Sequence, residues 1–261
     1  MGIGSQAKIE QRRLQVGGTT VRYEIAGTGK PIILVHGLAA STRWWAKNID
    51  VLTPHFQVHL IDLSGFGSER GRSRFVLNQA AQFLAQWMDN LHIERATIIG
   101  HSMGGRIVAE FAADFPQRVE RLVLVAPAIL PFGRGYTKQS WGMVQAIRRV
   151  PIPVLRMALT HTLRTGIIPI LNLGRKLLTS DIQDKLAQIQ APTLLIWGEY
   201  DTVVPVAVDA ILGQFLHTYR FAVIKGAGHV PMWEKAEEFN RLILDFLLEP
   251  EIEIGKQVSG K

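Results

Sequence analysis

A serine stands among glycines at residues 99–105, which read I-G-H-S-M-G-G. The spacing around Ser102 is G-x-S-x-G, with β-branched residues before it and a helical run after it. A sharp strand-to-helix turn holds such a serine in a sparsely populated backbone region and lifts its Oγ above the sheet, at a helix N-terminus that favours negative charge. The pattern therefore predicts a nucleophile at Ser102. The competing interpretation is a serine that caps a helix between packing glycines.

A serine hydroxyl needs a neighbouring base before it can attack a carbonyl carbon. His229 is the candidate base, because it follows the last predicted strand in the stretch G-A-G-H-V-P at residues 226–231. His36 also follows a strand but precedes the serine, and we expect it to shape the backbone. His101 adjoins the serine, so its side chain is expected to project away from Oγ. Structural or solvent-facing roles are expected for His55, His59, His92, His161 and His217.

The base in turn needs a carboxylate that fixes its tautomer and stabilises the imidazolium ion. Asp201 ends the stretch W-G-E-Y-D at residues 197–201, just past a continuous apolar strand. The chain order Ser, Asp, His is that of α/β-hydrolase sites. Glu199 is the local competitor, and Asp62 precedes the serine, so we expect Asp62 to fix a loop.

An oxyanion hole would complete the chemistry, with backbone N–H groups aimed at the developing negative charge. One donor is expected from Met103, which directly follows the serine. The other is expected from Leu38, because Gly37 lets the loop after the preceding strand approach a substrate carbonyl.

Large apolar residues flank these loops and suggest an apolar substrate. Trp44 and Trp45 follow the oxyanion loop, and Met232 and Trp233 follow the histidine. The alternative is that such residues only pack one part of the protein against another. The candidate substrate contacts are Gly37, Trp44, Trp141, Val230 and Trp233.

Apolar runs and helical periodicity alternate along most of the chain, which predicts an α/β fold with a mostly parallel, doubly wound sheet. Strands are expected at residues 21–26, 31–35, 56–62, 96–99, 121–126, 193–197 and 219–225. Helices are expected at residues 75–91, 103–115, 206–216 and 234–248.

The alternation breaks at residues 128–189, which contain helical runs and several prolines but no clear strand. We interpret this stretch as a helical insertion, the cap, in a core formed by residues 1–127 and 190–250, with residues 251–261 as a frayed tail. Eight basic residues and no acidic ones lie between Pro131 and Ser180, although the net charge of all 261 residues is only +7. A cap of this kind could contact anionic lipid or attract anionic substrates; the alternative is a set of solvated cations.

Composition narrows the class of protein. The chain contains no cysteine, and its first residues lack the apolar core of a signal peptide. Every apolar run is shorter than the roughly 18 residues that a spanning helix needs. These features lead us to expect a cytoplasmic protein, at most peripheral to a membrane. We expect no nucleic-acid partner, because no recognised binding motif is found.

Together these motifs resemble the α/β-hydrolase superfamily over about residues 21–248. The resemblance rests on H-G at 36–37, D-x-x-G-x-G at 62–67, G-x-S-x-G-G at 100–105, G-x-x-D at 198–201 and G-H at 228–229. It implies a Ser102–His229–Asp201 triad, a cap over the site, and no metal or organic cofactor. Ser64 departs from the proline that relatives often carry, which affects a turn rather than the chemistry.

Three functions remain open. The leading hypothesis is a carboxylesterase or lipase-like enzyme that forms an acyl-enzyme, since relatives that open epoxides or displace halide use aspartate at the elbow. The second is a carbon–carbon bond hydrolase of vinylogous ketones. Such relatives commonly have Asn or a similar small polar residue before the serine, where this chain has His101, although Arg148 or Arg149 could supply a cap cation. The third is a ligand-binding member of the fold without catalysis.

Overall fold

The computed structural model describes residues 7–63, 76–129, 150–206, 212–250 and 258–259. Its strands are β1 (Glu10–Val16), β2 (Thr19–Ala26), β3 (Lys30–Val35), β4 (Phe56–Ile61), β5 (Ala96–His101), β6 (Val119–Val125), β7 (Thr193–Gly198), β8 (Tyr219–Ile224) and β9 (Val258–Ser259). Its α-helices are α1 (Ile49–Leu52), α2 (Ala80–Asn90), α3 (Met103–Asp114), α5 (Ile152–Thr165), α6 (Ile167–Thr179), α7 (Gln183–Leu186), α9 (Pro231–Glu234) and α10 (Ala236–Leu248). Three short 3-10 helices are η1 (Thr42–Trp45), η2 (Leu77–Gln79) and η3 (Pro116–Arg118).

The described strands form one sheet in the order β1-β2-β4-β3-β5-β6-β7-β8-β9. β1 pairs with β2 and β2 with β4 in antiparallel fashion, and all other neighbours are parallel. The expected α/β fold with a mostly parallel sheet is confirmed.

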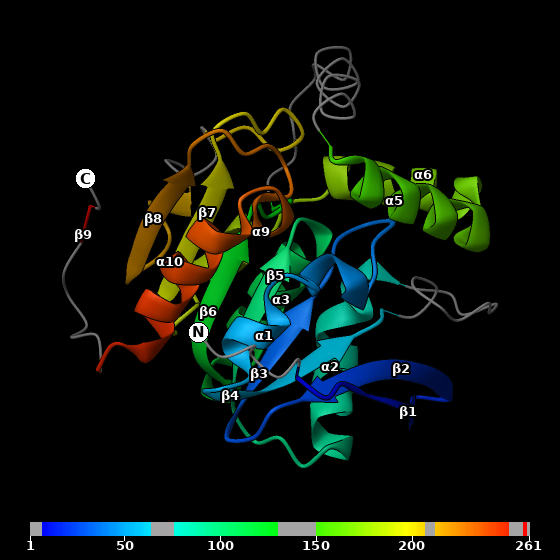
Figure 1. The fold of residues 1–261 in the computed structure, drawn as a ribbon, viewed down its shortest axis with the longest axis horizontal. Coiled ribbons are helices and arrows are strands. Elements are labelled where there is room, and N and C mark those ends of the chain that lie inside the picture. The colour runs from blue at the N-terminus through cyan, green and yellow to red at the C-terminus, as the bar shows by residue number, and fades with distance from the viewer. Residues whose placement is uncertain (1–6, 64–75, 130–149, 207–211, 251–257, 260–261) are drawn as a thin grey trace, which may run out of the picture.

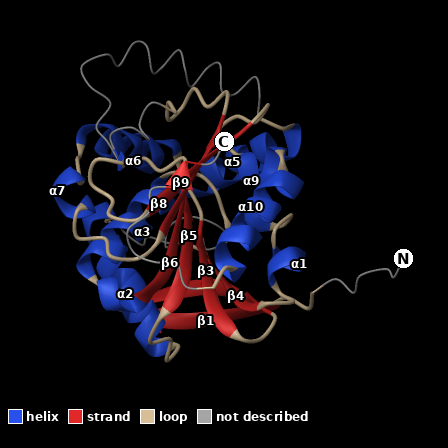
Figure 2. Cartoon of the chain, turned by 90° about the vertical axis from the view of Figure 1, so that its left-hand side faces the viewer, coloured by secondary structure: helices blue, strands red, loops and turns tan. Residues whose placement is uncertain are grey.

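Helices cover both faces of this sheet (Figure 1), and Figure 2 shows α2 and α3 on one side with α1 and α10 on the other. Alternate residues of the central strands enter the two cores. Ile33 and Val35 pack into the core that contains α2 and α3, whereas Ile32 and Leu34 pack into the core of α1 and α10. Burial on both faces explains why these strands read as continuous apolar runs.

The sequence analysis missed β1. Its sequence, EQRRLQV, is largely exposed, and only its last residue, Val16, is fully buried. It forms an edge hairpin with β2 from Val16↔Thr19 to Glu10↔Ile25. A solvated edge strand needs little apolar content, so hydrophobicity gives a weak signal there.

Helix boundaries differ modestly from those expected. The helix expected at 75–91 begins as η2 and continues as α2, and the one expected at 234–248 is split at Lys235 into α9 and α10. Residues 207–211 of the helix expected at 206–216 lie outside the described residues, as do Trp141, Arg148, Arg149 and Ser64. In the expected tail, Val258 and Ser259 pair with β8, which satisfies backbone groups of that strand, and the other residues of the tail are not described.

The described part of residues 128–189 contains α5, α6 and α7 and no strand. Both views place α5 and α6 at one end of the sheet (Figures 1 and 2). At the end of α6, Arg106 of α3 donates from Nη1 to the Ser180 carbonyl oxygen at 3.0 Å. The same guanidinium pairs with Glu110 at 3.0 Å, so a buried ion pair of α3 supports the C-terminal end of α6.

Candidate active site

Ser102 occupies a sharp turn between β5 and α3. Its φ of 54° and ψ of −115° are unusual for a residue with a side chain. Two hydrogen bonds fix this geometry: its N–H donates to the Val125 carbonyl oxygen at 2.9 Å, and its carbonyl accepts from the Ala128 N–H at 3.1 Å. A β-carbon added at Gly104 would lie 2.4 Å from the Val35 carbonyl oxygen, so α3 and β3 meet too closely for a larger residue.

His229 and Asp201 lie beside this serine. Nε2 of His229 is 3.1 Å from Ser102 Oγ, and its Nδ1 is 2.8 Å from Asp201 Oδ2. The other carboxylate oxygen of Asp201 accepts from the N–H groups of Val203 at 2.8 Å and Val204 at 2.9 Å. This order lets the carboxylate hold the imidazole with its unprotonated nitrogen toward the hydroxyl.

A close backbone contact brings the aspartate and histidine loops together. A β-carbon at Gly198, the last residue of β7, would lie only 2.0 Å from the Gly228 carbonyl oxygen. Glu234 of α9 then fixes the residues on both sides of His229, since its carboxylate accepts from the N–H groups of Gly228 at 2.7 Å and Val230 at 2.9 Å. Glu199, the alternative carboxylate, instead accepts from the Gly226 N–H.

His101 contacts the candidate base, a role that the sequence analysis missed. Its Nε2 is 2.8 Å from the His229 carbonyl oxygen, and the two rings lie 4.8 Å apart. Burial, reinforced by the charge of His229, holds the pKa of His101 well below 6.5. His101 is therefore neutral, and Nε2 is the nitrogen that carries its proton, because it faces a carbonyl acceptor.

The loop that would supply the oxyanion hole is fixed from behind by His36. Its Nδ1 donates to the Gly37 carbonyl oxygen at 2.8 Å, and its Nε2 accepts from the Leu63 N–H at 3.1 Å. Burial lowers the pKa of His36, and the neighbouring Asp62 opposes this shift. Asp62 also accepts from the Thr42 N–H at 3.1 Å. Both residues thus shape the loop after β3.

The two expected oxyanion donors belong to elements that meet at Ser102. Met103 is the buried first residue of α3. Leu38 follows Gly37, where an added β-carbon would lie 3.2 Å from the Ser102 β-carbon. The Leu38 side chain is half-buried and extends toward α6, with its Cδ2 3.8 Å from the place of a β-carbon at Gly174.

The other candidate substrate contacts lie in different surroundings. Trp44 is buried with its ring 5.7 Å from that of His101, so it packs beside His101. Val230 is buried, and the Trp233 ring lies under the Lys47 ammonium group at 4.9 Å. Trp141 lies outside the described residues.

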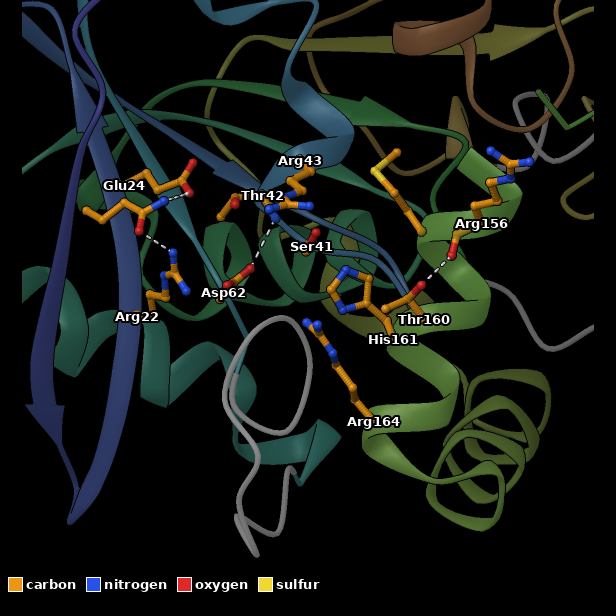
Figure 3. A pocket seen from close by; sticks show the side chains of 12 residues that line it. Arg22, Glu24, Ser41, Thr42, Arg43, Asp62, Arg156, Thr160, His161 and Arg164 are labelled. Atoms are coloured by element: carbon orange, nitrogen blue, oxygen red, sulfur yellow. Dashed lines mark hydrogen bonds between the residues drawn. The ribbon is translucent and has the colours of Figure 1, made fainter. Parts of the chain in front are cut away.

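A polar cavity of about 210 Å³ lies where α5 meets the core (Figure 3). Ser41, Thr42 and Asp62 line it from the core, and His161 and Arg164 line it from α5. Figure 3 shows Arg164 pointing toward His161 and the cavity. Ser102 and His229 are not among its lining residues, so it marks the contact between insertion and core rather than the place of attack.

A family model described as alpha/beta hydrolase fold matches residues 30–152. A 2-hydroxy-6-oxononadienedioate/2-hydroxy-6-oxononatrienedioate hydrolase of Paraburkholderia phymatum is 31% identical over 88% of this chain and 92% of its own length. The chain belongs to the α/β-hydrolase superfamily. It is also 29% identical, over 86% of its length, to a pimeloyl-[acyl-carrier protein] methyl ester esterase of Yersinia enterocolitica, of which it covers 96%.

Two further comparisons carry less functional information. The dihydrolipoyllysine-residue acetyltransferase component of the acetoin cleaving system of Cupriavidus necator is 34% identical over 87% of this chain, but the chain spans only 66% of that protein's length. The enol-lactonase from Burkholderia xenovorans LB400 superposes with a TM-score of 0.78 at 24% identity, covering 91% of this chain and 100% of that one. That likeness shows the fold.

Proposed function

We propose that this α/β hydrolase cleaves a carboxylic ester of an apolar acid through an acyl-enzyme on Ser102. The observation that carries the proposal is the hydrogen-bonded series from Ser102 Oγ to His229 and on to Asp201, at 3.1 and 2.8 Å. The esterase named above, which is related over most of this chain, supports ester hydrolysis.

In the proposed mechanism each residue has its own step. His229 Nε2 takes the proton of Ser102 as Oγ attacks the ester carbonyl carbon, and Asp201 stabilises the imidazolium ion. The N–H groups of Met103 and Leu38 receive the oxyanion. His229 then protonates the leaving alcohol, and a water molecule activated by the same histidine releases the acid. This sequence of steps requires no metal or organic cofactor.

A second candidate is cleavage of a carbon–carbon bond in a ring-fission product. It is supported by the Paraburkholderia relative, whose name describes that class of hydrolase. The same triad could serve this reaction, with water attacking a ketone. The carbon–carbon hydrolases commonly have Asn or a similar small polar residue before the serine, whereas this chain has His101. Ester cleavage is therefore our first choice.

A panel of p-nitrophenyl esters of increasing chain length, assayed beside coloured ring-fission dienoates, separates these two reactions. Ester turnover that Ser102→Ala lowers by about 10⁶ in kcat supports the first proposal. Bleaching of dienoates with no ester turnover would favour the second. A fluorophosphonate probe completes the test, because a ligand-binding protein without catalysis would leave Ser102 unlabelled.

A further inference from the structure

An unusual number of large apolar side chains face solvent on α5 and α6. Eleven such residues are exposed in the described part of the chain, and seven of them lie on this helix pair. Leu163 is 76% exposed and Ile168 is 68% exposed. The seven are Ile152, Leu155, Leu159, Leu163, Ile167, Ile168 and Leu171. Soluble proteins rarely leave such a concentration of apolar surface without a partner.

The arrangement on α5 separates an inner from an outer apolar face. Residues 152, 155, 159 and 163 are spaced three or four apart and therefore share one side of the helix. Val154 and His161 are buried, and Met157 packs against the core of α1 and α10. The exposed row is thus a second apolar face, which the described core does not cover.

Basic residues accompany this face. Arg156 follows Leu155 of the row, and Arg175 and Lys176 lie on α6, whereas Arg164 points toward the cavity at the core. Arg156, Arg175 and Lys176 are exposed, and none of the three forms an ion pair with a described residue. The sequence contains no acidic residue from Pro131 to Ser180 that could neutralise them.

We propose that the outer face of α5 and α6 docks on the surface of a bilayer that contains anionic lipid. Apolar side chains of an interfacial helix enter the boundary between headgroups and acyl chains, while flanking cations meet lipid phosphates. A second copy of this chain fits less well, because two such faces would oppose cation to cation without an acidic residue between them. None of the described helices is long and apolar enough to cross a membrane.

Docking in this orientation also has a consequence for the candidate active site. α6 approaches the oxyanion loop, since Leu38 Cδ2 lies 3.8 Å from the β-carbon position of Gly174. The lipid-facing helix pair therefore contacts the loop after β3, whose Gly37 also approaches Ser102. The docking proposal does not depend on which bond Ser102 breaks, because it concerns only the outer surface of the pair.

Co-sedimentation with vesicles tests the proposal. The full chain is mixed with vesicles of phosphatidylcholine alone, or of phosphatidylcholine with phosphatidylglycerol, at increasing NaCl. We expect binding only to the anionic vesicles, and salt should weaken it. The double variant Arg175→Gln, Lys176→Gln should lower the partition constant about fivefold per residue.

Two further double variants separate lipid contact from general charge effects. Leu159→Gln, Leu163→Gln should lower the partition constant by at least tenfold. The matched variant Lys225→Gln, Arg241→Gln removes two exposed cations elsewhere and should leave binding within twofold of the parent. Circular dichroism verifies that each variant folds, and Ser102→Ala should bind as the parent does.

Three results would overturn docking: equal binding to both kinds of vesicle, equal loss in the matched variant, or no binding at all. Sedimentation equilibrium could give a fourth result that overturns docking. A dimer abolished by Leu159→Gln, Leu163→Gln would instead assign the face to a second copy of the chain.

Discussion

Each residue of the candidate triad is held by a contact that takes no part in bond breaking. The backbone of Ser102 is fixed by Val125 and Ala128, and the free carboxylate oxygen of Asp201 is held by two N–H groups. His229 is held from both sides, by Glu234 through the neighbouring backbone and by His101 at its own carbonyl. Such support matters because small displacements of reacting groups cost large factors in rate.

His101 should therefore act as a positioning residue. Replacing it in His101→Leu removes the donor to the His229 carbonyl, and we expect kcat to fall roughly 10- to 100-fold with little change in KM. His101→Gln keeps a donor at similar reach and should recover most of the loss. Steady-state kinetics on the best substrate of the panel measures both values.

A merely structural role for His101 would give a different result. Both variants would then lose folding stability together, and neither would show a kcat loss at unchanged KM. Urea unfolding of the two variants provides the control, since their free energies of unfolding should differ by less than their rates do.

Among the elements, the central strands of the sheet were easier to predict than the strand at its edge. Seven strands were expected, the last five of them from mostly continuous apolar runs, because parallel strands covered on both faces have no polar side. β1 was missed because the exposed hairpin that it forms requires only a few apolar contacts. The outer face of α5 was not predicted either, since periodicity shows that a helix has apolar residues but not which of them find a partner.

Residues of the site could be predicted where the sequence marks a turn. Ser102, Asp201 and His229 each follow a strand and have glycine nearby, and the structure brings their side chains together. His101 and Glu234 act through the backbone of His229, a contact that depends on how distant loops pack. No local sequence pattern indicates a contact to the backbone around His229, although the sequence does show a histidine directly before Ser102.

The turn at Ser102 depends on how closely α3 approaches β3. A β-carbon at Gly104 would lie 2.4 Å from the Val35 oxygen and 2.5 Å from the His36 oxygen. Both are backbone atoms that cannot rotate away, so Gly104→Ala should lower the free energy of unfolding by about 1–3 kcal/mol or more and reduce activity. Urea denaturation measures the first effect, and ester hydrolysis measures the second.

Gly174 provides a matched control within another helix. Its nearest atom to an added β-carbon is Leu38 Cδ2 at 3.8 Å, an ordinary contact. Gly174→Ala should therefore stabilise the protein by about 0.5–1 kcal/mol, because alanine loses less backbone entropy in a helix. Equal changes in the free energy of unfolding for the two alanine variants would show that the close approach of α3 to β3 does not require glycine at position 104.

In the whole molecule, polar groups connect the insertion to the core. Arg106 reaches the Ser180 carbonyl, and Lys185 pairs with Asp114 of α3 at 2.7 Å. The cavity beside His161 lies at the same boundary. Because these polar contacts lie on the side toward the core, the outer apolar faces of α5 and α6 stay exposed. These exposed faces are the ones that we propose contact lipid.

Burial of neutral histidines makes the stability of the whole molecule depend on pH. His59, buried on β4 with its ring 6.0 Å from that of Trp87, has its pKa lowered from 6.5 to about 4 by burial and by the charge of Arg12. The pKa values of His36 and His101 are lowered by burial as well. Between pH 6.5 and about 4 the unfolded chain binds protons that the folded chain refuses, so the free energy of unfolding must fall as the pH falls through this window.

For His59 alone the expected loss across this window is about 3 kcal/mol. The variant His59→Phe keeps a ring against Trp87 and removes the titrating group, along with a buried Nδ1 that has no hydrogen-bond partner. Its free energy of unfolding, measured by urea denaturation at several pH values, should therefore decline less steeply than that of the parent. Parallel curves for the two proteins would mean that His59 is not held neutral in the folded state, and the acid sensitivity would then belong to His36 and His101.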